Sequence, residues 1–226
     1  KPFFVEKPSG LDFKENKKLL KLIKKYKNLN MVGYNRRFYS IFEKGLKIIN
    51  KKGRLLGVTI EGHERMWKIK NIIDSKNIKN WIYANSSHTI DLIRFFGGEI
   101  KRITNVKTRL IEKNNDQFVM IFETNKNIIG SYTSHWYSPG SWNVKLYGEK
   151  VSVIFDPLEK GYWIDENFKK REIFPDKKDI KYKAGFFNQM KSFQNLLQTK
   201  KNKWPSQDII ESHKTMKIIN TLLTSY

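Results

Sequence analysis

The sequence contains no cysteine. Without thiols the chain cannot form disulfides, thiolate zinc sites or iron-sulfur clusters, and it cannot use a cysteine nucleophile. Long apolar runs are also missing, because no such run approaches the roughly 18 residues of a membrane span. These absences predict a soluble globular protein of a reducing compartment, with the cytoplasm as the default location and no membrane partner.

Acidic residues are few: 22 Asp and Glu stand against 44 Lys and Arg, which gives a formal net charge of +22. Such a charge is typical of many nucleic-acid-binding proteins. The excess is mostly lysine spread along the whole chain, however, and no zinc-finger, RNP or Gly-X-X-Gly motif accompanies it. We therefore expect solvent-exposed lysine faces, as at residues 14–27 and 177–183, and no nucleic-acid partner. Nucleic-acid binding stays open as an alternative that only the net charge supports.

The first 35 residues predict a strand, a helix and a second strand. Residues 2–8 form a short apolar stretch with strand character that ends in a proline turn. Asp12 and Glu15 have the spacing of a capping box, and apolar residues at helical spacing continue to about Lys27. Residues 29–34 then predict a short buried strand, so the segment has the order of a βαβ unit in a parallel sheet.

The rest of the chain predicts a second, larger domain. A helix is expected at 39–52, then an extended segment at 58–64, an irregular loop at 65–80 and a helix at 83–96. Six short strand candidates follow, at 103–110, 118–123, 128–134, 143–147, 151–155 and 162–164. Two amphipathic helices, at 182–199 and 206–224, close the chain. The predicted fold class is α/β (α+β): the end of a βαβ domain, then an α/β domain whose large, mostly antiparallel open sheet of five or six strands is flanked by helices.

Three short motifs occur in a fixed order along the chain. Glu6-Lys7-Pro8 follows the first strand, Val32-Gly33-Tyr34-Asn35-Arg36-Arg37-Phe38 leaves the second, and Ser87-His88-Thr89-Ile90-Asp91-Leu92 runs toward Gly97-Gly98. In this order and spacing they resemble the motifs of the glucose-fructose oxidoreductase, inositol dehydrogenase and MocA family (Gfo/Idh/MocA). The chain also ends as this family does, with a phenylalanine-containing helix, a short link with Pro205 and a last helix.

The resemblance implies a two-domain dehydrogenase, in which a Rossmann domain binds NAD or NADP and an α/β domain supplies the substrate site and often the oligomer interface. Residues 1–35 would be the end of the Rossmann domain. Residues 36–226 would be the substrate-binding and oligomerisation domain, with the last helices packed back on the Rossmann part. No Gly-X-Gly-X-X-Gly motif, which places a pyrophosphate at a helix N-terminus, occurs in the chain. We therefore expect a C-terminal fragment of a longer protein, inactive by itself.

The resemblance also implies roles for the motif residues. Lys7 is expected to contact a substrate hydroxyl beside the nicotinamide, and either to stabilise an alkoxide or to move the proton. Glu6 and Pro8 complete the cofactor-binding motif, with Glu6 near the nicotinamide ribose and the peptide bond before Pro8 often cis. His88 is the expected acid or base and a substrate contact, since imidazole suits proton transfer near neutral pH. The alternatives are a solvated turn at the first motif and a structural histidine.

One position departs from the family pattern. Members with this kind of site usually carry an aspartate four residues before the histidine, and Ala84 stands there in this sequence. Alanine can neither orient an imidazole nor relay a proton. Three explanations stay open: Lys7 with His88 suffices, a neighbour such as Tyr83 or Asn85 substitutes, or dehydrogenase activity is reduced or lost. Asn85 is therefore a candidate substrate-binding residue.

Asn35, Arg36 and Arg37 follow the second strand at its C-terminal end, where ligands of open α/β sheets bind. We predict that they contact the substrate, and that one arginine holds an anionic substrate such as a uronate or a sugar nucleotide. An ion pair that fixes the domain junction is the alternative for that arginine. Asp91 matches a family position, and we predict a structural role for it.

Two further groups of residues are candidates for a site. Two histidines lie on strand-like segments and could be imagined as a metal site together with two glutamates: His63 and His135 with Glu61 and Glu64. They lack metal-ligand spacing, so we predict no metal site. Four aromatic residues either stack on a sugar ring or pack in the core and in interfaces: Trp67, Trp136, Tyr137 and Trp142.

Together these observations predict an NAD(P)-dependent oxidoreductase. It would transfer a hydride between the nicotinamide cofactor and a hydroxyl or keto group of a sugar, cyclitol or sugar nucleotide. The alternative, which Ala84 motivates, is a non-catalytic sugar-binding or scaffold protein of the same fold. The open sheet also predicts a homodimer or homotetramer that forms through this sheet.

Overall fold

The computed structural model describes residues 1–224. Residues 225 and 226, the end of the predicted substrate domain, lie outside the described part. Near the N-terminus, β1 (Phe3–Val5) and β2 (Asn30–Val32) form a parallel two-stranded sheet connected by α1 (Phe13–Tyr26). The Asp12 carboxylate caps α1, because it accepts a hydrogen bond of 2.9 Å from the backbone N–H of Glu15. The predicted order of strand, helix and parallel strand is confirmed.

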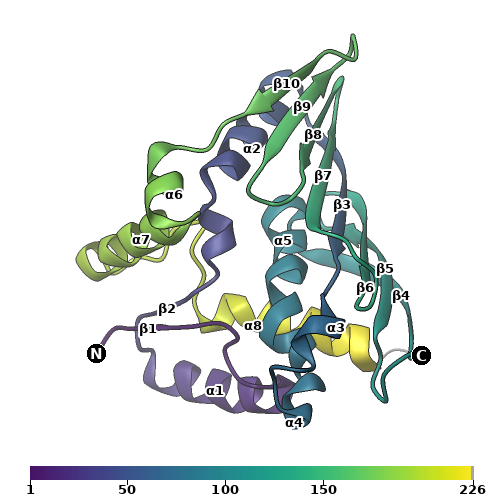
Figure 1. Cartoon of the computed structure of the whole chain (residues 1–226). Coiled ribbons are helices and arrows are strands. Elements are labelled where there is room, and N and C mark those ends of the chain that lie inside the picture. The colour runs from purple at the N-terminus through teal and green to yellow at the C-terminus, as the bar shows by residue number, and fades with distance from the viewer. Residues whose placement is uncertain (225–226) are drawn as a thin grey trace.

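A large sheet of eight strands dominates the rest of the chain, in the order β10-β9-β8-β7-β3-β6-β5-β4 (Figure 1). Its members are β3 (Leu55–Gly62), β4 (Ile100–Thr108), β5 (Gln117–Thr124), β6 (Ile129–His135), β7 (Trp142–Gly148), β8 (Val151–Phe155), β9 (Gly161–Asp165) and β10 (Lys170–Ile173). Neighbouring strands are antiparallel except β3 and β6, which run parallel. The predicted large, mostly antiparallel sheet is confirmed.

The predicted number of five or six strands is wrong. β3 lies between β7 and β6. The extended segment predicted at 58–64, which stands apart from the six strand candidates, therefore belongs to the same sheet. β10 was not predicted, because three of its four residues are charged and only Ile173 is buried. A short charged strand at a sheet edge lacks the apolar alternation that identifies strands in a sequence.

Three helices lie against one face of the large sheet: α2 (Ser40–Lys52), α5 (Ser87–Gly97) and α8 (Ile209–Thr224) (Figure 1). The core between these layers is rich in aromatic rings. The ring centroid of Phe42 on α2 lies 5.1 Å from that of Phe96 on α5 and 4.7 Å from that of Phe155 on β8. In the described part of the chain, the opposite face of the sheet is not covered by a helix, which leaves the predicted open face.

Two predicted segments differ from the structure. Residues 65–80, predicted as an irregular loop, contain two single-turn helices, α3 (Met66–Ile69) and α4 (Ser75–Ile78). The predicted helix over 182–199 begins only at Phe186, as α7 (Phe186–Thr199), and a separate short helix that was not predicted, α6 (Lys177–Tyr182), precedes it. Between them Lys183 and Gly185 have φ angles of 67° and 80°, which a right-handed helix cannot accommodate.

The segment before α5 begins as a π-helical turn, η2 (Ile82–Ser86), rather than as a regular helix. A short 3-10 helix, η1 (Asn35–Phe38), leads from β2 toward α2. Both irregular turns carry residues of the predicted site, so the site is built where the regular backbone pattern is interrupted.

The last helix returns to the N-terminal segment. α8 packs against α1, and the backbone N–H of Val32 donates a hydrogen bond of 2.9 Å to the carbonyl oxygen of Gln207. The Asn30 side chain accepts another, of 2.8 Å, from the backbone N–H of Ile209. None of the helices between residues 1 and 224 combines the length and hydrophobicity needed to cross a bilayer.

Candidate functional site

Lys7 leaves the C-terminal end of β1 and reaches the turn before α5. Its side-chain amine donates a hydrogen bond to the carbonyl oxygen of Ala84, which lies in the π-helical turn η2. Such turns depart from the regular helical bonding pattern and are frequent at functional sites. Burial, and next the positive charge of Arg36, lower the pKa of Lys7 from 10.5 to about 8. A lysine with this pKa can hold or release a proton near neutral pH.

His88 lies in the first turn of α5 and is 6% exposed. Its ring centroid is 5.9 Å from that of Tyr34 and 6.1 Å from that of Trp142. Burial, followed by the charges of Arg36 and Lys7, lowers the pKa of His88 well below 6.5, so the imidazole is neutral near neutral pH. Its buried Nδ1 atom has no hydrogen-bond partner among the described residues.

The two neighbouring arginines have different surroundings. Arg37 forms a two-pronged ion pair with Asp91, with Nε 2.5 Å from Oδ2 and Nη2 3.0 Å from Oδ1. Both side chains are buried. The geometry of Arg37 agrees with the alternative given above for one of the arginines, an ion pair. The geometry of Asp91 agrees with the structural role predicted for it.

Within the described residues, 1–224, no carboxylate forms an ion pair with Arg36. Its guanidinium carbon lies 4.5 Å from the ring centroid of Trp142, in the geometry of a cation–π contact. The neighbouring Asn35 is buried, and its side-chain amide donates a 3.3 Å hydrogen bond to the carbonyl oxygen of Ala184. Of these three predicted substrate contacts, Arg36 is therefore the one whose polar group stays most available.

Glu64 is a residue of this site that the sequence analysis considered only as a metal ligand. It follows β3 directly and is 2% exposed. Its carboxylate accepts hydrogen bonds from Trp81 Nε1 at 3.0 Å, Asn85 Nδ2 at 2.7 Å and Ser86 Oγ at 2.7 Å. Burial raises the pKa of Glu64, while these three bonds act in the opposite direction. No sequence motif marked it; the signal was its position immediately after a central strand.

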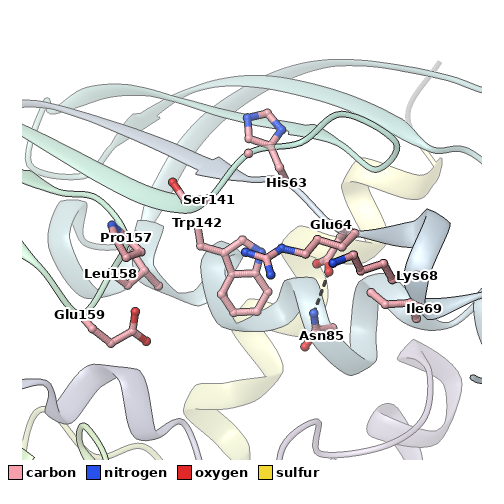
Figure 2. Close-up of a pocket in the computed structure, with 12 residues that line it drawn as sticks. His63, Glu64, Lys68, Ile69, Asn85, Ser141, Trp142, Pro157, Leu158 and Glu159 are labelled. Carbon is pink, nitrogen blue, oxygen red and sulfur yellow. Dashed lines mark hydrogen bonds between the residues drawn. The ribbon is translucent and has the colours of Figure 1, made fainter. Parts of the chain in front are cut away.

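A cavity of about 340 Å³ lies beside these residues. Its lining residues are His63, Glu64, Arg65, Lys68, Ile69, Asn85, Gly140, Ser141, Trp142, Pro157, Leu158 and Glu159. Figure 2 shows Glu64 and Asn85 joined by their hydrogen bond on one side of Trp142, with Pro157, Leu158 and Glu159 on the other side. The structure thus places the predicted substrate residue Asn85 at a cavity.

Lys7, Arg36 and His88 are not among the lining residues but adjoin them. Lys7 contacts the cavity wall through Ala84, the neighbour of Asn85, while Arg36 and His88 both contact Trp142. The predicted residues of the three motifs therefore come together at one place, although they are far apart in the sequence. This arrangement can bind a small polar molecule and exchange a proton with it.

The remaining candidates lie elsewhere or have structural contacts. The rings of His63 and His135 stack at 5.6 Å, and in residues 1–224 no group of three or more His, Asp or Glu side chains could hold a metal ion. Trp136 is buried against Phe118 in the core. The Tyr137 hydroxyl donates to Glu112, outside the cavity. Trp142 is the aromatic candidate that the structure places at the cavity.

Comparison with known proteins gives one family match. Residues 53–154 match the family described as the GFO/IDH/MocA C-terminal domain. Comparison with curated protein sequences gives no match.

Several solved structures share the fold. A levoglucosan dehydrogenase in complex with NADH and levoglucosan has a TM-score of 0.82 at 15% identity, and the alignment covers 100% of this chain and 71% of that one. An oxidoreductase from Thermotoga maritima has a TM-score of 0.78 at 18% identity, with 98% and 68% covered. The UDP-N-acetylglucosamine 3-dehydrogenase of Acidithiobacillus ferrooxidans has a TM-score of 0.76 at 13% identity, with 98% and 69% covered.

These structures agree with the family match, and the match spans β3 to β8 of the large sheet. The resemblance inferred from the three motifs is confirmed: residues 53–154 match the GFO/IDH/MocA C-terminal domain, and the solved structures share the fold of the chain.

Proposed function

We propose that this chain supplies the substrate side of an NAD(P)-dependent oxidoreductase. The reaction would transfer a hydride between the nicotinamide and a hydroxyl or keto group of a sugar, cyclitol or sugar nucleotide. The observation that carries the proposal is the partly buried Lys7, which has a pKa near 8 and lies between the C-terminal end of β1 and the cavity wall at Ala84. The enzymes with the same fold support it, since two of them are dehydrogenases of sugar-like compounds.

Lys7 would act on the oxygen of the reacting hydroxyl. In its neutral form the amine can accept the hydroxyl proton as the carbon is oxidised, and in its charged form it can stabilise the negative oxygen. The neutral His88 can hold a second hydroxyl through a ring nitrogen. Asn85 and Glu64 would position the sugar from the cavity wall, and the ring of Trp142 offers an apolar face.

The residues at the ends of β1 and β2 fit the nicotinamide end of a dinucleotide. Gly33 leaves space at the ends of these two strands, because a Cβ atom at this position would lie 2.9 Å from Glu6 Oε2 and 3.0 Å from the Phe4 ring. The buried Oε1 atom of Gln189 has no hydrogen-bond partner among the described residues, so this acceptor still lacks a donor. Glu6, Lys7 and Pro8 would hold this end, and the peptide bond before Pro8 is cis, as the resemblance implies. NAD or NADP, when bound, supplies the hydride chemistry.

We also propose assembly through the uncovered face of the large sheet. Val106 on β4, Ile121 on β5 and Ile129 on β6 are 69%, 58% and 64% exposed. Neighbouring apolar side chains on an open sheet favour contact with a second copy. A homodimer or homotetramer would cover them.

The experiment is an assay of hydride transfer by the protein at the length its gene encodes. NAD and NADP are each titrated against a panel of sugars, cyclitols and sugar nucleotides, and reduced nicotinamide is followed by absorbance. We expect turnover with at least one compound of the panel. Binding of a sugar without any turnover would favour the alternative, a non-catalytic member of the fold, which Ala84 in place of an aspartate motivates.

A further inference from the structure

The guanidinium of Arg36 is partly buried, and among residues 1–224 no carboxylate forms an ion pair with it. Its Nε atom is inaccessible and has no hydrogen-bond partner among residues 1–224. Its Nη1 donates one long bond, of 3.4 Å, to Asn35 Oδ1. Arg37, the next residue, shows the ordinary arrangement, since its charge is met by Asp91 at 2.5 Å. Most of the five N–H donors of Arg36 therefore have no partner among the described residues and can bind a ligand.

A second positive charge, that of Lys7, lies nearby and also has no ion-pair partner among residues 1–224. The Lys7 amine donates to a neutral carbonyl oxygen, that of Ala84, and the positive charge of Arg36 adds to burial in lowering the pKa of Lys7. Burial lowers the pKa of both groups, and His88 beside them is neutral. The buried acid of the site, Glu64, already accepts three hydrogen bonds from neutral donors. Glu6, Glu64 and Glu159 act on these charges from a distance, but none of them forms an ion pair with Arg36 or Lys7 among the described residues.

The lining of the cavity next to this cluster adds no excess of acidic side chains. Its lining contains two basic side chains, Arg65 and Lys68, and two acidic ones, Glu64 and Glu159. Arg36 and Lys7 adjoin this wall, and even with Glu6 beside Lys7 the surroundings of a bound molecule carry a net positive charge. A desolvated positive site of this kind binds an anion more strongly than a neutral compound of the same shape.

We propose that Arg36 is the anion-binding residue of the substrate site, with Lys7 adding positive charge beside it, and that the substrate is a monosaccharide that carries a carboxylate. This rests on the proposed function, which puts the substrate in the cavity beside Trp142. The planar guanidinium can donate two parallel hydrogen bonds to a carboxylate. A cavity of about 340 Å³ is at the small end for small-molecule sites, which favours a sugar acid over a larger sugar nucleotide.

The test is a calorimetric titration of the protein at its natural length, without cofactor, with glucuronate, glucose, UDP-N-acetylglucosamine and inorganic phosphate. We expect glucuronate to bind about tenfold to a hundredfold more tightly than glucose, the range of a charge-assisted hydrogen bond. Arg36→Met should abolish this preference, and Arg36→Lys should keep part of it. The matched control is Arg102→Met, which removes the same charge from a side chain on β4 that is 78% exposed, and it should keep the preference. Circular dichroism checks that each variant is folded.

Four results would overturn the proposal: equal binding of glucuronate and glucose, no binding of either, a folded Arg36→Met that keeps the preference, or phosphate that competes as well as glucuronate. Tight binding of the sugar nucleotide without glucuronate would assign the site to a phosphate group and also refute the carboxylate. Because the titration needs no hydride transfer, the two proposals can fail separately. An inactive protein that prefers glucuronate contradicts only the proposed function, and an active one without the preference contradicts only this inference.

Discussion

The side-chain amine of Lys7 donates a hydrogen bond to the carbonyl oxygen of Ala84, 77 positions further along the chain. This contact connects the end of β1 with the π-helical turn before α5. Because the acceptor is a backbone oxygen, the lysine is held without any contribution from the side chain of residue 84. The same turn contacts a buried carboxylate, because Asn85 donates a hydrogen bond to Glu64.

The lowered pKa of Lys7 predicts a specific dependence of stability on pH. The folded protein loses the Lys7 proton near pH 8, whereas the unfolded chain keeps it to about 10.5. Between these values the unfolded state binds more protons, so this residue's contribution to stability rises with pH, by up to about 3 kcal/mol. Below pH 8 the full cost of burying the charge is present.

Urea unfolding of the wild type and of Lys7→Met at several pH values between 7 and 11 measures this contribution as a difference. The free energy of unfolding of the wild type should increase relative to the variant as the pH rises through this range. A difference that stays constant, or that decreases, would show that Lys7 is not desolvated in the folded protein.

The Arg37–Asp91 ion pair predicts a large stability effect. Arg37→Met leaves the Asp91 carboxylate buried with its main partner removed, which costs about 3–5 kcal/mol in comparable buried pairs. Lys44→Met is the control, because its ion pair with Asp176 is partly exposed and contributes about 0–1 kcal/mol. Equal losses in chemical denaturation for the two variants would mean that the buried pair does not stabilise the fold.

Glu64 should resist even its isosteric replacement. In Glu64→Gln one oxygen becomes an NH₂ group that faces donors from Trp81, Asn85 or Ser86, so at least one buried hydrogen bond is lost. We expect a decrease of about 1–3 kcal/mol in the free energy of unfolding. Glu61→Gln, on the same strand but with a side chain 42% exposed, should change it by less. An unchanged stability in Glu64→Gln would show that the carboxylate is not required by its donors.

The open sheet predicts that a charge on its face weakens assembly. Ile121 is 58% exposed in the middle of β5, so Ile121→Glu should leave the fold intact and shift the sedimentation mass toward the monomer. Circular dichroism controls for folding. A wild-type protein that already sediments as a monomer would refute assembly through this face.

Much of the fold could be predicted because its signals are local. The cap at Asp12 and the burial alternation of β5 follow from residue type and spacing, and both are observed. β10 could not be predicted, since a charged edge strand is held by its neighbour β9 rather than by its own pattern. The interruption at Lys183 and Gly185 depends on backbone angles that the apolar spacing of this segment does not reveal.

The site was predictable only in part for a similar reason. The motifs identified Lys7 and His88, but no motif contains Glu64, whose donors come from three positions on another segment. Which arginine stays available also depends on tertiary contacts. Asp91 is brought to Arg37 and not to Arg36 by the packing of α5 against η1.

The most direct test of the account is the rate of hydride transfer by Lys7→Met, measured in the protein at its natural length with the best substrate of the panel. Loss of the group that moves the proton should reduce turnover by about 10²–10⁴-fold with the fold intact. Lys14→Met, which removes an exposed lysine on α1, should turn over as the wild type does. Near-normal turnover by a folded Lys7→Met would contradict the central claim that this lysine acts on the reacting oxygen.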